Sequence, residues 1–378
     1  MIIVLFFILV TGFIIFKTKN KFLNLIIFLL TITLILILLN PKLCITSAHH
    51  GVSLFYNSVF PSLFPFTVIS GLILSFNGIN VYSKLFGRFL CKPLHLPSCA
   101  SFPLIVSLIC GFPLGAKYTG AISNEDHLNY DNATTTLIVA SNASPLFVIG
   151  VVGGVLLKNI KLGYILFFIN VITCYITGYI FSSKNSSSYI NFCDIKKNKV
   201  NVGNAIKQSI EGALNTSLIV CAYITFFSVL IEYMNQYILD VFPTFDSLFG
   251  KTLFGLIEIT NGITMISNTE TSVLLKLILI SFLISFSGLS IFSQVYSLVY
   301  NKRLSFKKYF LAKILQGVIS SCLVCVFILF VSITDFSSLM VSTQHQNQLK
   351  SINVIYIVLY SILTISFIFC FISQKKRS

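Results

Sequence analysis

Helix-breaking residues interrupt an apolar stretch at residues 108–117, LICGFPLGAK. Gly111 and Gly115 permit backbone conformations that other residues avoid, and Pro113 removes a hydrogen-bond donor and prevents a continuous helix. At membrane depth such a break exposes backbone amides that favour an anionic group and carbonyls that favour a cation. The pattern predicts a binding site for a small polar or anionic solute, although a tight packing turn would use the same residues.

A second break follows at residues 140–149, ASNASPLFVI, where Asn142, Ser144 and Pro145 stand in apolar sequence. An Asn amide near the middle of a membrane needs hydrogen-bond partners, because no water is available there. Two adjacent breaks are harder to explain as ordinary kinks than one. We expect the backbone around residues 111–115 and Ser144 to bind the solute, and Asn142 to orient it.

The second half of the chain has comparable features. In LIEITNG, Glu258 precedes Thr260 and Asn261. An ionisable group in an apolar segment costs about 2.5–3.5 kcal/mol, so we predict that Glu258 carries a proton or a cation and that Asn261 orients the solute. Alternatively, Glu258 caps a re-entrant helix or pairs with Lys117. Polar residues continue in the next apolar run, at Ser285, Ser287, Ser290 and Gln294.

Lys117 ends the first break and has two open interpretations. Its ammonium could meet an anionic solute or Glu258. Equally, its long side chain could extend to the cytoplasmic face while its methylene groups stay in apolar surroundings.

The composition places these breaks in a membrane. The 378 residues are 56% hydrophobic and only 10% charged, and the mean hydropathy is +0.91. Soluble domains carry roughly 25% charged residues. The net charge of +15 fits an excess of Lys and Arg in cytoplasmic loops better than nucleic-acid binding, since no basic stripe accompanies it.

The sequence lacks the common motifs of nucleotide binding, serine hydrolysis and zinc proteolysis. The sequence contains no phosphate-binding P-loop, no G-x-S-x-G nucleophile elbow and no H-E-x-x-H. Cys322 and Cys325 read as small packing residues of a helix, and His49 and His50 are expected in an outer loop without a third metal ligand. We therefore expect no enzymatic activity, no cofactor and no metal site.

Apolar runs long enough to span a membrane, which takes about 17–25 residues, indicate nine transmembrane helices. They are residues 1–16, 22–40, 54–76, 134–157, 162–182, 208–232, 272–298, 309–331 and 352–373. Residues 101–116 and 251–267 are also apolar, but polar or helix-breaking residues interrupt them, which favours re-entrant segments. Residues 81–97 are predicted to form an amphipathic helix on the inner face.

The distribution of Lys and Arg predicts the orientation. If both interrupted runs are re-entrant, most of the 26 Lys and Arg residues, including those of the 183–207 loop, fall on the cytoplasmic side. This places the N-terminus outside and the C-terminus inside a multi-pass cell-membrane protein. The first re-entrant segment then enters from the cytoplasm and the second from outside.

The same order of features occurs twice, which suggests two inverted repeats, as in many secondary transporters. Gly115 matches Gly262, and Ser144 matches a position near Ser290. The predicted fold class is an all-α polytopic membrane protein with about nine transmembrane helices and two re-entrant broken-helix segments. Its predicted parts are two N-terminal helices (1–53), repeat 1 (54–182), a basic cytoplasmic linker (183–207), repeat 2 (208–300) and two C-terminal helices (301–378).

Five motifs between residues 50 and 310 resemble the YlbJ-type sporulation integral membrane proteins of spore-forming bacteria. They are PSLFPF at 61–66, CGFPLGAK at 110–117, SNASPLFVIG at 141–150, LIEITNGI at 256–263 and SGLSIFSQ at 287–294. The resemblance implies the nucleoside-recognition gate domain, which also occurs in concentrative nucleoside transporters and ferrous-iron transport protein B. It further implies a role in sporulation and spore cortex formation at the membranes around the forespore, without supplying a substrate.

Two functions remain open at this point. The first is a transporter-like protein that moves a small polar or anionic solute. The second is a membrane scaffold for spore envelope assembly, in which the breaks only shape helix packing and the basic loops recruit partners. The expected partners are the lipid bilayer, an unknown small solute, and either a second copy of the chain or other sporulation membrane proteins, with no nucleic acid.

Overall fold

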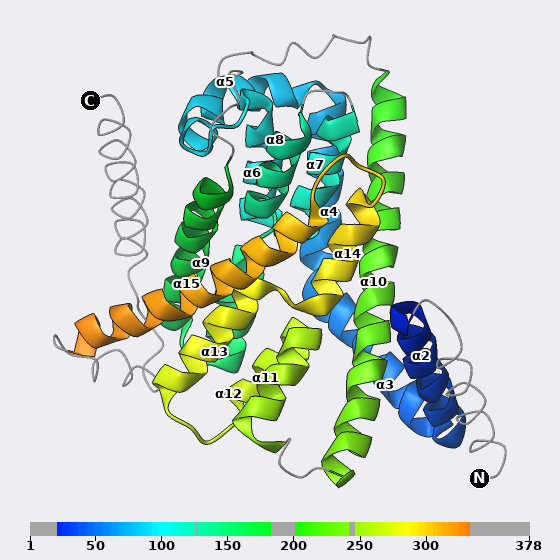
Figure 1. The fold of residues 1–378 in the computed structure, drawn as a ribbon. Coiled ribbons are helices and arrows are strands. Elements are labelled where there is room, and N and C mark those ends of the chain that lie inside the picture. Colours follow the sequence, from blue (N-terminus) through cyan, green and yellow to red (C-terminus); the bar gives the residue numbers. More distant parts are fainter. Residues whose placement is uncertain (1–20, 125–127, 183–200, 242–245, 333–378) are drawn as a thin grey trace, which may run out of the picture.

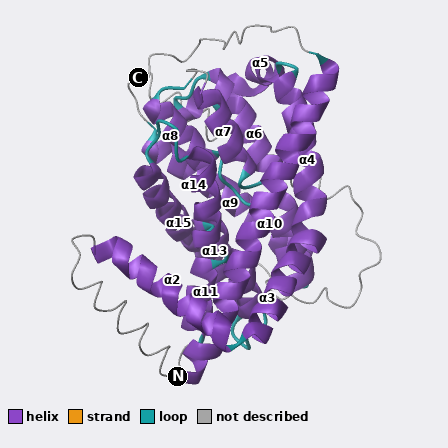
Figure 2. Cartoon of the chain, turned by 90° about the vertical axis from the view of Figure 1, so that its right-hand side faces the viewer, coloured by secondary structure: helices purple, strands orange, loops and turns teal. Residues whose placement is uncertain are grey.

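The computed structural model describes residues 21–124, 128–182, 201–241 and 246–332. These residues form helices joined by short turns, and no strand occurs among them (Figures 1 and 2). The expectation of an all-α chain is confirmed.

The helices follow one another with few long connections. They are α2 (Lys21–Leu39), α3 (Pro41–Leu54), η1 (Phe55–Val59), α4 (Phe60–Ser75), α5 (Gly78–Leu90), η2 (Lys92–Leu94), η3 (Ser98–Ala100), α6 (Ser101–Cys110), α7 (Leu114–Asn124), α8 (Tyr130–Val139), η4 (Leu146–Leu156), α9 (Ile160–Phe181), α10 (Val202–Val241), α11 (Leu248–Ile257), α12 (Ile259–Ser267), α13 (Val273–Phe286), α14 (Gly288–Val299) and α15 (Phe306–Ser332).

Four of these segments are long and apolar enough to cross a membrane: α9, α10, the α13–α14 pair and α15. Two further pairs qualify only if each is one bent span. The α2–α3 pair bends by 105° and the α4–α5 pair by 97°. The described residues therefore contain four to six candidate spans. The predicted spans 1–16 and 352–373 lie outside the described residues.

The region before α4 differs from the prediction. His49 and His50, expected in an outer loop, lie in α3. This helix starts where Asn40 accepts a hydrogen bond from the backbone N–H of Leu43 (3.3 Å), directly before Pro41. Asn at the N-cap with Pro at the first helical position is a strong helix-start signal. Because α3 contains several polar residues, it does not form a long apolar run and was not predicted as a helix.

The predicted amphipathic helix corresponds to α5, which is shorter than the expected 81–97. Its buried face consists of Ile79, Ser83 and Gly87, one per helical turn. Val81 and Leu85 point outward, with 55% and 67% of their surface exposed. An apolar exposed face on a helix nearly perpendicular to α4 fits a helix that lies in the membrane interface.

The breaks at residues 108–117 and 140–149 each interrupt a helix, and so do the polar stretches around Glu258 and Ser287. Gly111 separates α6 from α7 with φ +78°, and residues 140–145 separate α8 from η4. Glu258 stands in extended conformation between α11 and α12. Ser287 (φ 82°) and Gly288 (φ +77°) adopt left-handed conformations between α13 and α14. Residues 140–145 and 287–288 thus divide predicted spans into two shorter helices.

Around two of the breaks, backbone segments pack against each other without room for another side chain. A Cβ atom added at Gly115 would lie 1.8 Å from the carbonyl oxygen of Ala140, which joins the α6–α7 break to the α8–η4 break. In the second half, a Cβ at Gly262 would lie 2.0 Å from the Cα of Gly255. Both obstacles are backbone atoms, so the helices would have to move apart to admit any other residue.

We expect Gly115→Ala to destabilise the protein by about 1–3 kcal/mol, the usual cost of overpacking, and more if the breaks separate. The control is Gly150→Ala, where the nearest atom to the new Cβ is the tip of Leu146 at 3.6 Å. The measurement is the melting temperature of the two purified variants in detergent. Equal melting temperatures would contradict the close contact between the breaks.

Candidate functional site

The first two breaks are held together by backbone hydrogen bonds. The N–H of Phe112 donates to the carbonyl of Asn142 (2.7 Å), and the N–H of Asn142 donates to Ser107 Oγ (3.2 Å). Gly111 packs directly on Ser144. The structure therefore brings together four predicted site residues, Gly111, Gly115, Asn142 and Ser144. Pro113 and Pro145 stand at the starts of the helices that follow these breaks.

The C-terminal end of α8 presents carbonyl groups that other side chains satisfy. Asn142 Nδ2 donates to the carbonyl of Val139 (2.8 Å), and Cys174 Sγ of α9 approaches the same oxygen (3.3 Å). Lys313 Nζ of α15 donates to the carbonyl of Ser141. Because the last carbonyls of a helix lack intrahelical partners, these contacts replace the hydrogen bonds that the break removes.

Lys313 belongs to a buried hydrogen-bond network that we call the polar crossing. Its members come from the α8–η4 break, α9, α13 and α15: Ser141, Asn142, Asn170, Ser285, Tyr309, Lys313 and Gln316. None has more than 1% of its surface exposed.

Gln316 is the centre of the polar crossing. Its Oε1 accepts from Lys313 Nζ (2.8 Å), and its Nε2 donates to Asn170 Oδ1 (3.1 Å). Ser285 Oγ donates to the same oxygen of Asn170 (3.1 Å), and Tyr309 pairs with Ser141 Oγ (2.8 Å). The network connects the first half of the chain to the α13–α14 break.

Glu258 acts as a helix cap. Its carboxylate accepts from the backbone N–H groups of Thr260 (3.1 Å) and Asn261 (2.8 Å), and only 3% of the residue is exposed. No Lys, Arg or His forms an ion pair with it in the part of the chain that the structure describes. These contacts fit the capping alternative for Glu258.

Lys117 does not reach Glu258. Its Nζ donates to the carbonyl of Gly212 (2.9 Å) and to Thr216 Oγ1 (2.8 Å), both on α10. Lys117 thereby joins α7 to the long helix α10.

Ser287 and Gln294 lie at and after the α13–α14 break. Ser287 Oγ and Gln294 Oε1 are buried and have no hydrogen-bond partner among the described residues, and the same holds for Asn170 Nδ2. Buried polar atoms nearly always have a partner. Gln294 Nε2 donates to Ser290 Oγ (3.4 Å). No hydrogen bond within the described ranges joins Glu258, Thr260 or Asn261 to the polar crossing.

Sequence reasoning missed Asn170, Tyr309, Lys313 and Gln316. The signal was available, because Asn170 and Lys313 are strongly polar residues inside the apolar runs 162–182 and 309–331. An ionisable group in an apolar segment is a functional candidate. Lys313 meets this description as well as Glu258 does.

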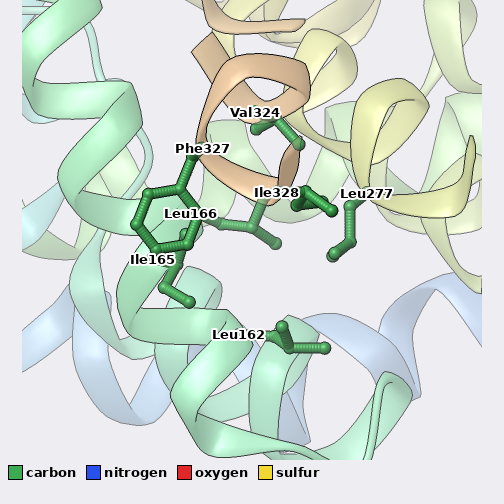
Figure 3. Close-up of a pocket in the computed structure, with 7 residues that line it drawn as sticks. All are labelled: Leu162, Ile165, Leu166, Leu277, Val324, Phe327 and Ile328. Atoms are coloured by element: carbon green, nitrogen blue, oxygen red, sulfur yellow. The ribbon is translucent and has the colours of Figure 1, made fainter. Parts of the chain in front are cut away.

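A small pocket lies on the same three helices as the polar crossing but is entirely apolar (Figure 3). Leu166 of α9, Leu277 of α13 and Ile328 of α15 line it, together with four other apolar residues. It offers no hydrogen-bonding group to a polar solute.

The fold and the site define an all-helical, multi-pass membrane protein in which the α8–η4 break, α9, α13 and α15 meet in a buried polar network. The chain is 26% identical over 316 residues to the sporulation integral membrane protein YlbJ of Bacillus subtilis (strain 168), a match that covers 75% of this chain and 78% of the relative. This confirms the resemblance to the YlbJ-type sporulation integral membrane proteins. No protein-family model and no solved structure matches the chain.

We expect Glu258→Ala to destabilise the protein by about 1–2 kcal/mol, because two amides at the start of α12 lose their acceptor. Glu258→Gln should lose less, since its amide oxygen still accepts one hydrogen bond. The exposed Glu270→Gln is the control. The melting temperatures of the purified variants should be lowest for Glu258→Ala, intermediate for Glu258→Gln and close to wild type for Glu270→Gln. A Glu258→Ala variant as stable as the wild type would disprove the capping role.

Proposed function

We propose that this protein is transporter-like and moves a small polar or anionic solute across a membrane that surrounds the forespore, as a step required for spore cortex formation. We also propose that it catalyses no reaction. The name of the relative supports the sporulation context. The observation that carries the transport proposal is a set of buried polar atoms without hydrogen-bond partners among the described residues: Ser287 Oγ at the α13–α14 break, Gln294 Oε1 in α14 and Asn170 Nδ2 in α9. An unsatisfied buried group costs about 1–3 kcal/mol, which a bound solute or water would recover.

We further propose that the chain contains two inverted repeats. The helices of the second half follow those of the first in the same order and with a nearly constant offset: α6 begins at Ser101 and α11 at Leu248, an offset of 147 residues. α9 begins at Ile160 and α15 at Phe306, an offset of 146. The second repeat would then extend through α15, beyond residue 300.

A contact near the proposed symmetry axis supports this register. Asn170 and Gln316 are also separated by 146 positions, and their side chains hydrogen-bond each other (3.1 Å). Residues related by a two-fold operation meet each other at its axis. In Figures 1 and 2, α6 and α7 lie in the upper half of the molecule and α11 in the lower half, which supports entry from opposite faces. Nine spans, with the N-terminus outside and the C-terminus inside, remain part of this proposal.

The solute site would lie between the α8–η4 and α13–α14 breaks. There, Ser287 Oγ and Gln294 Oε1, which have no hydrogen-bond partner among the described residues, would contact the solute, and the backbone near Ser144 would bind its polar group. The close packing of the breaks around Gly115 supports an occluded state, from which the two halves must separate to release solute.

Uptake into proteoliposomes tests the transport proposal. The probes are radiolabelled lactate, succinate, glutamate and uridine. We expect at least one to enter above the protein-free background, and we expect Ser287→Ala and Gln294→Leu to reduce that flux at least about fivefold by removing solute contacts. The matched control is Ser293→Ala in α14, a half-buried residue whose hydroxyl donates to the carbonyl of Leu289 in its own helix. Flux that both variants retain in full would contradict the site.

The close packing of the breaks also favours a second candidate, a scaffold for spore envelope assembly. With Gly115 against Ala140 and Gly262 against Gly255, the broken helices would serve as rigid joints. The basic linker 183–207 would recruit partners, and a second copy of the chain is among them.

Crosslinking in sporulating cells distinguishes the scaffold from the transporter. A scaffold should yield stoichiometric partners through residues 183–207, and deletion of that linker should abolish sporulation while Ser287→Ala and Gln294→Leu leave it intact. Loss of sporulation in both site variants, with normal protein levels, would exclude a purely structural role.

A further inference from the structure

The buried ammonium of Lys313 stands at the carbonyl end of a broken helix. α8 ends at Val139, and Lys313 Nζ donates to the carbonyl of Ser141, two residues beyond. The C-terminal end of a helix carries a partial negative charge, which attracts cations. In transporters with broken helices, unwound carbonyls and C-terminal half-helix ends of this kind coordinate Na⁺ or a proton.

Two oxygen atoms accept hydrogen bonds from Lys313 Nζ. Both of its hydrogen-bond partners are neutral oxygens that can only accept, the carbonyl of Ser141 and Oε1 of Gln316. The orientation of the Gln316 amide is fixed from its other end, because its Nε2 donates to Asn170 Oδ1. Neutral amide and carbonyl oxygens are also the ligands of hard metal cations.

No negative side chain accounts for this lysine. Lys313 is fully buried, and no carboxylate forms an ion pair with it within the described ranges of the chain. A charged side chain at the centre of a membrane helix is costly and is retained where it pairs with another group or with backbone carbonyls. Here the carbonyl end of α8 fills that role.

Only the second of the two proposed repeats carries a lysine at this position. With the 146-residue offset of α9 and α15, the counterpart of Lys313 in the first half is Phe167. Gln316, in contrast, has the polar counterpart Asn170. The ammonium is therefore an addition to one repeat and not part of the shared framework.

We propose that the carbonyl end of α8, with Gln316, is a cation site whose resident cation is the chain's own Lys313 ammonium, in the place where a free alkali cation would otherwise bind. The stability of the protein then does not depend on Na⁺ or K⁺. If the proposed transport function holds, its flux is likewise independent of an Na⁺ gradient.

Chemical rescue tests this proposal by stability alone, so the result does not depend on whether any solute is transported. We expect Lys313→Ala to lower the melting temperature of the full-length protein in detergent by about 5–10 °C. Ethylammonium chloride should restore at least half of that loss, because its ammonium fits the space left by the side chain. Choline chloride at the same concentration should not, since choline has no N–H donor.

Three controls complete the experiment. Lys313→Met fills the space without a donor and should lose stability without rescue. Lys307→Ala, exposed on the same helix, should match the wild type. The wild type should melt within about 1 °C in NaCl, KCl and choline chloride.

Several results would overturn the proposal: wild-type protein stabilised by Na⁺ or K⁺, Lys313→Ala as stable as the wild type, or equal effects of ethylammonium and choline on Lys313→Ala. If Lys313→Ala fails to fold alone, recovery of folded protein from membranes solubilised in ethylammonium chloride supports the site. If no folded Lys313→Ala protein is recovered in either ethylammonium chloride or choline chloride, the proposal is contradicted.

Discussion

The need to satisfy backbone hydrogen bonds at membrane depth governs the whole arrangement. A continuous helix satisfies its own amides and carbonyls, whereas a broken one exposes several at each end. Here the missing partners come from elsewhere in the chain: Ser107 and Phe112 bond the α8–η4 break, and Lys313 reaches it from α15. Helices far apart in sequence are therefore fixed against each other by the ends that a membrane would otherwise leave unpaired.

Two breaks are satisfied by opposite charges, both of which come from the second half of the chain. Glu258 lies at the N-terminal end of α12, where amides point outward, and Lys313 lies at the carbonyl end of α8. Each charge complements the helix dipole that it faces. Glu258 accepts from two backbone amides, and Lys313 donates to a backbone carbonyl and to Gln316 Oε1, so neither charge is held by the other.

The breaks were predictable because Gly, Pro and Asn act on their own backbone. Gly111, Asn142 and Glu258 all interrupt helices where the sequence indicates it. The polar crossing was harder to predict, because Asn170 and Gln316 lie in uninterrupted helices. Their role depends on the hydrogen bond between them, which joins helices that are far apart in the sequence. The capping role of Glu258 was one of two alternatives, and hydrogen-bond geometry was needed to favour it. The bend before α3 was missed because its signal, Asn40 followed by Pro41, lies outside any long apolar run.

The length of α10 has a consequence for the membrane itself. Its 40 residues make a rod about 60 Å long at 1.5 Å per residue, about twice the thickness of the hydrocarbon core. A rod of this length either tilts steeply or projects several turns into the aqueous phase. Its first turns carry the exposed Lys207–Glu211 pair, which belongs in water. Since Lys117 holds α7 to this same rod, the depth of α7 in the bilayer is coupled to the position of α10.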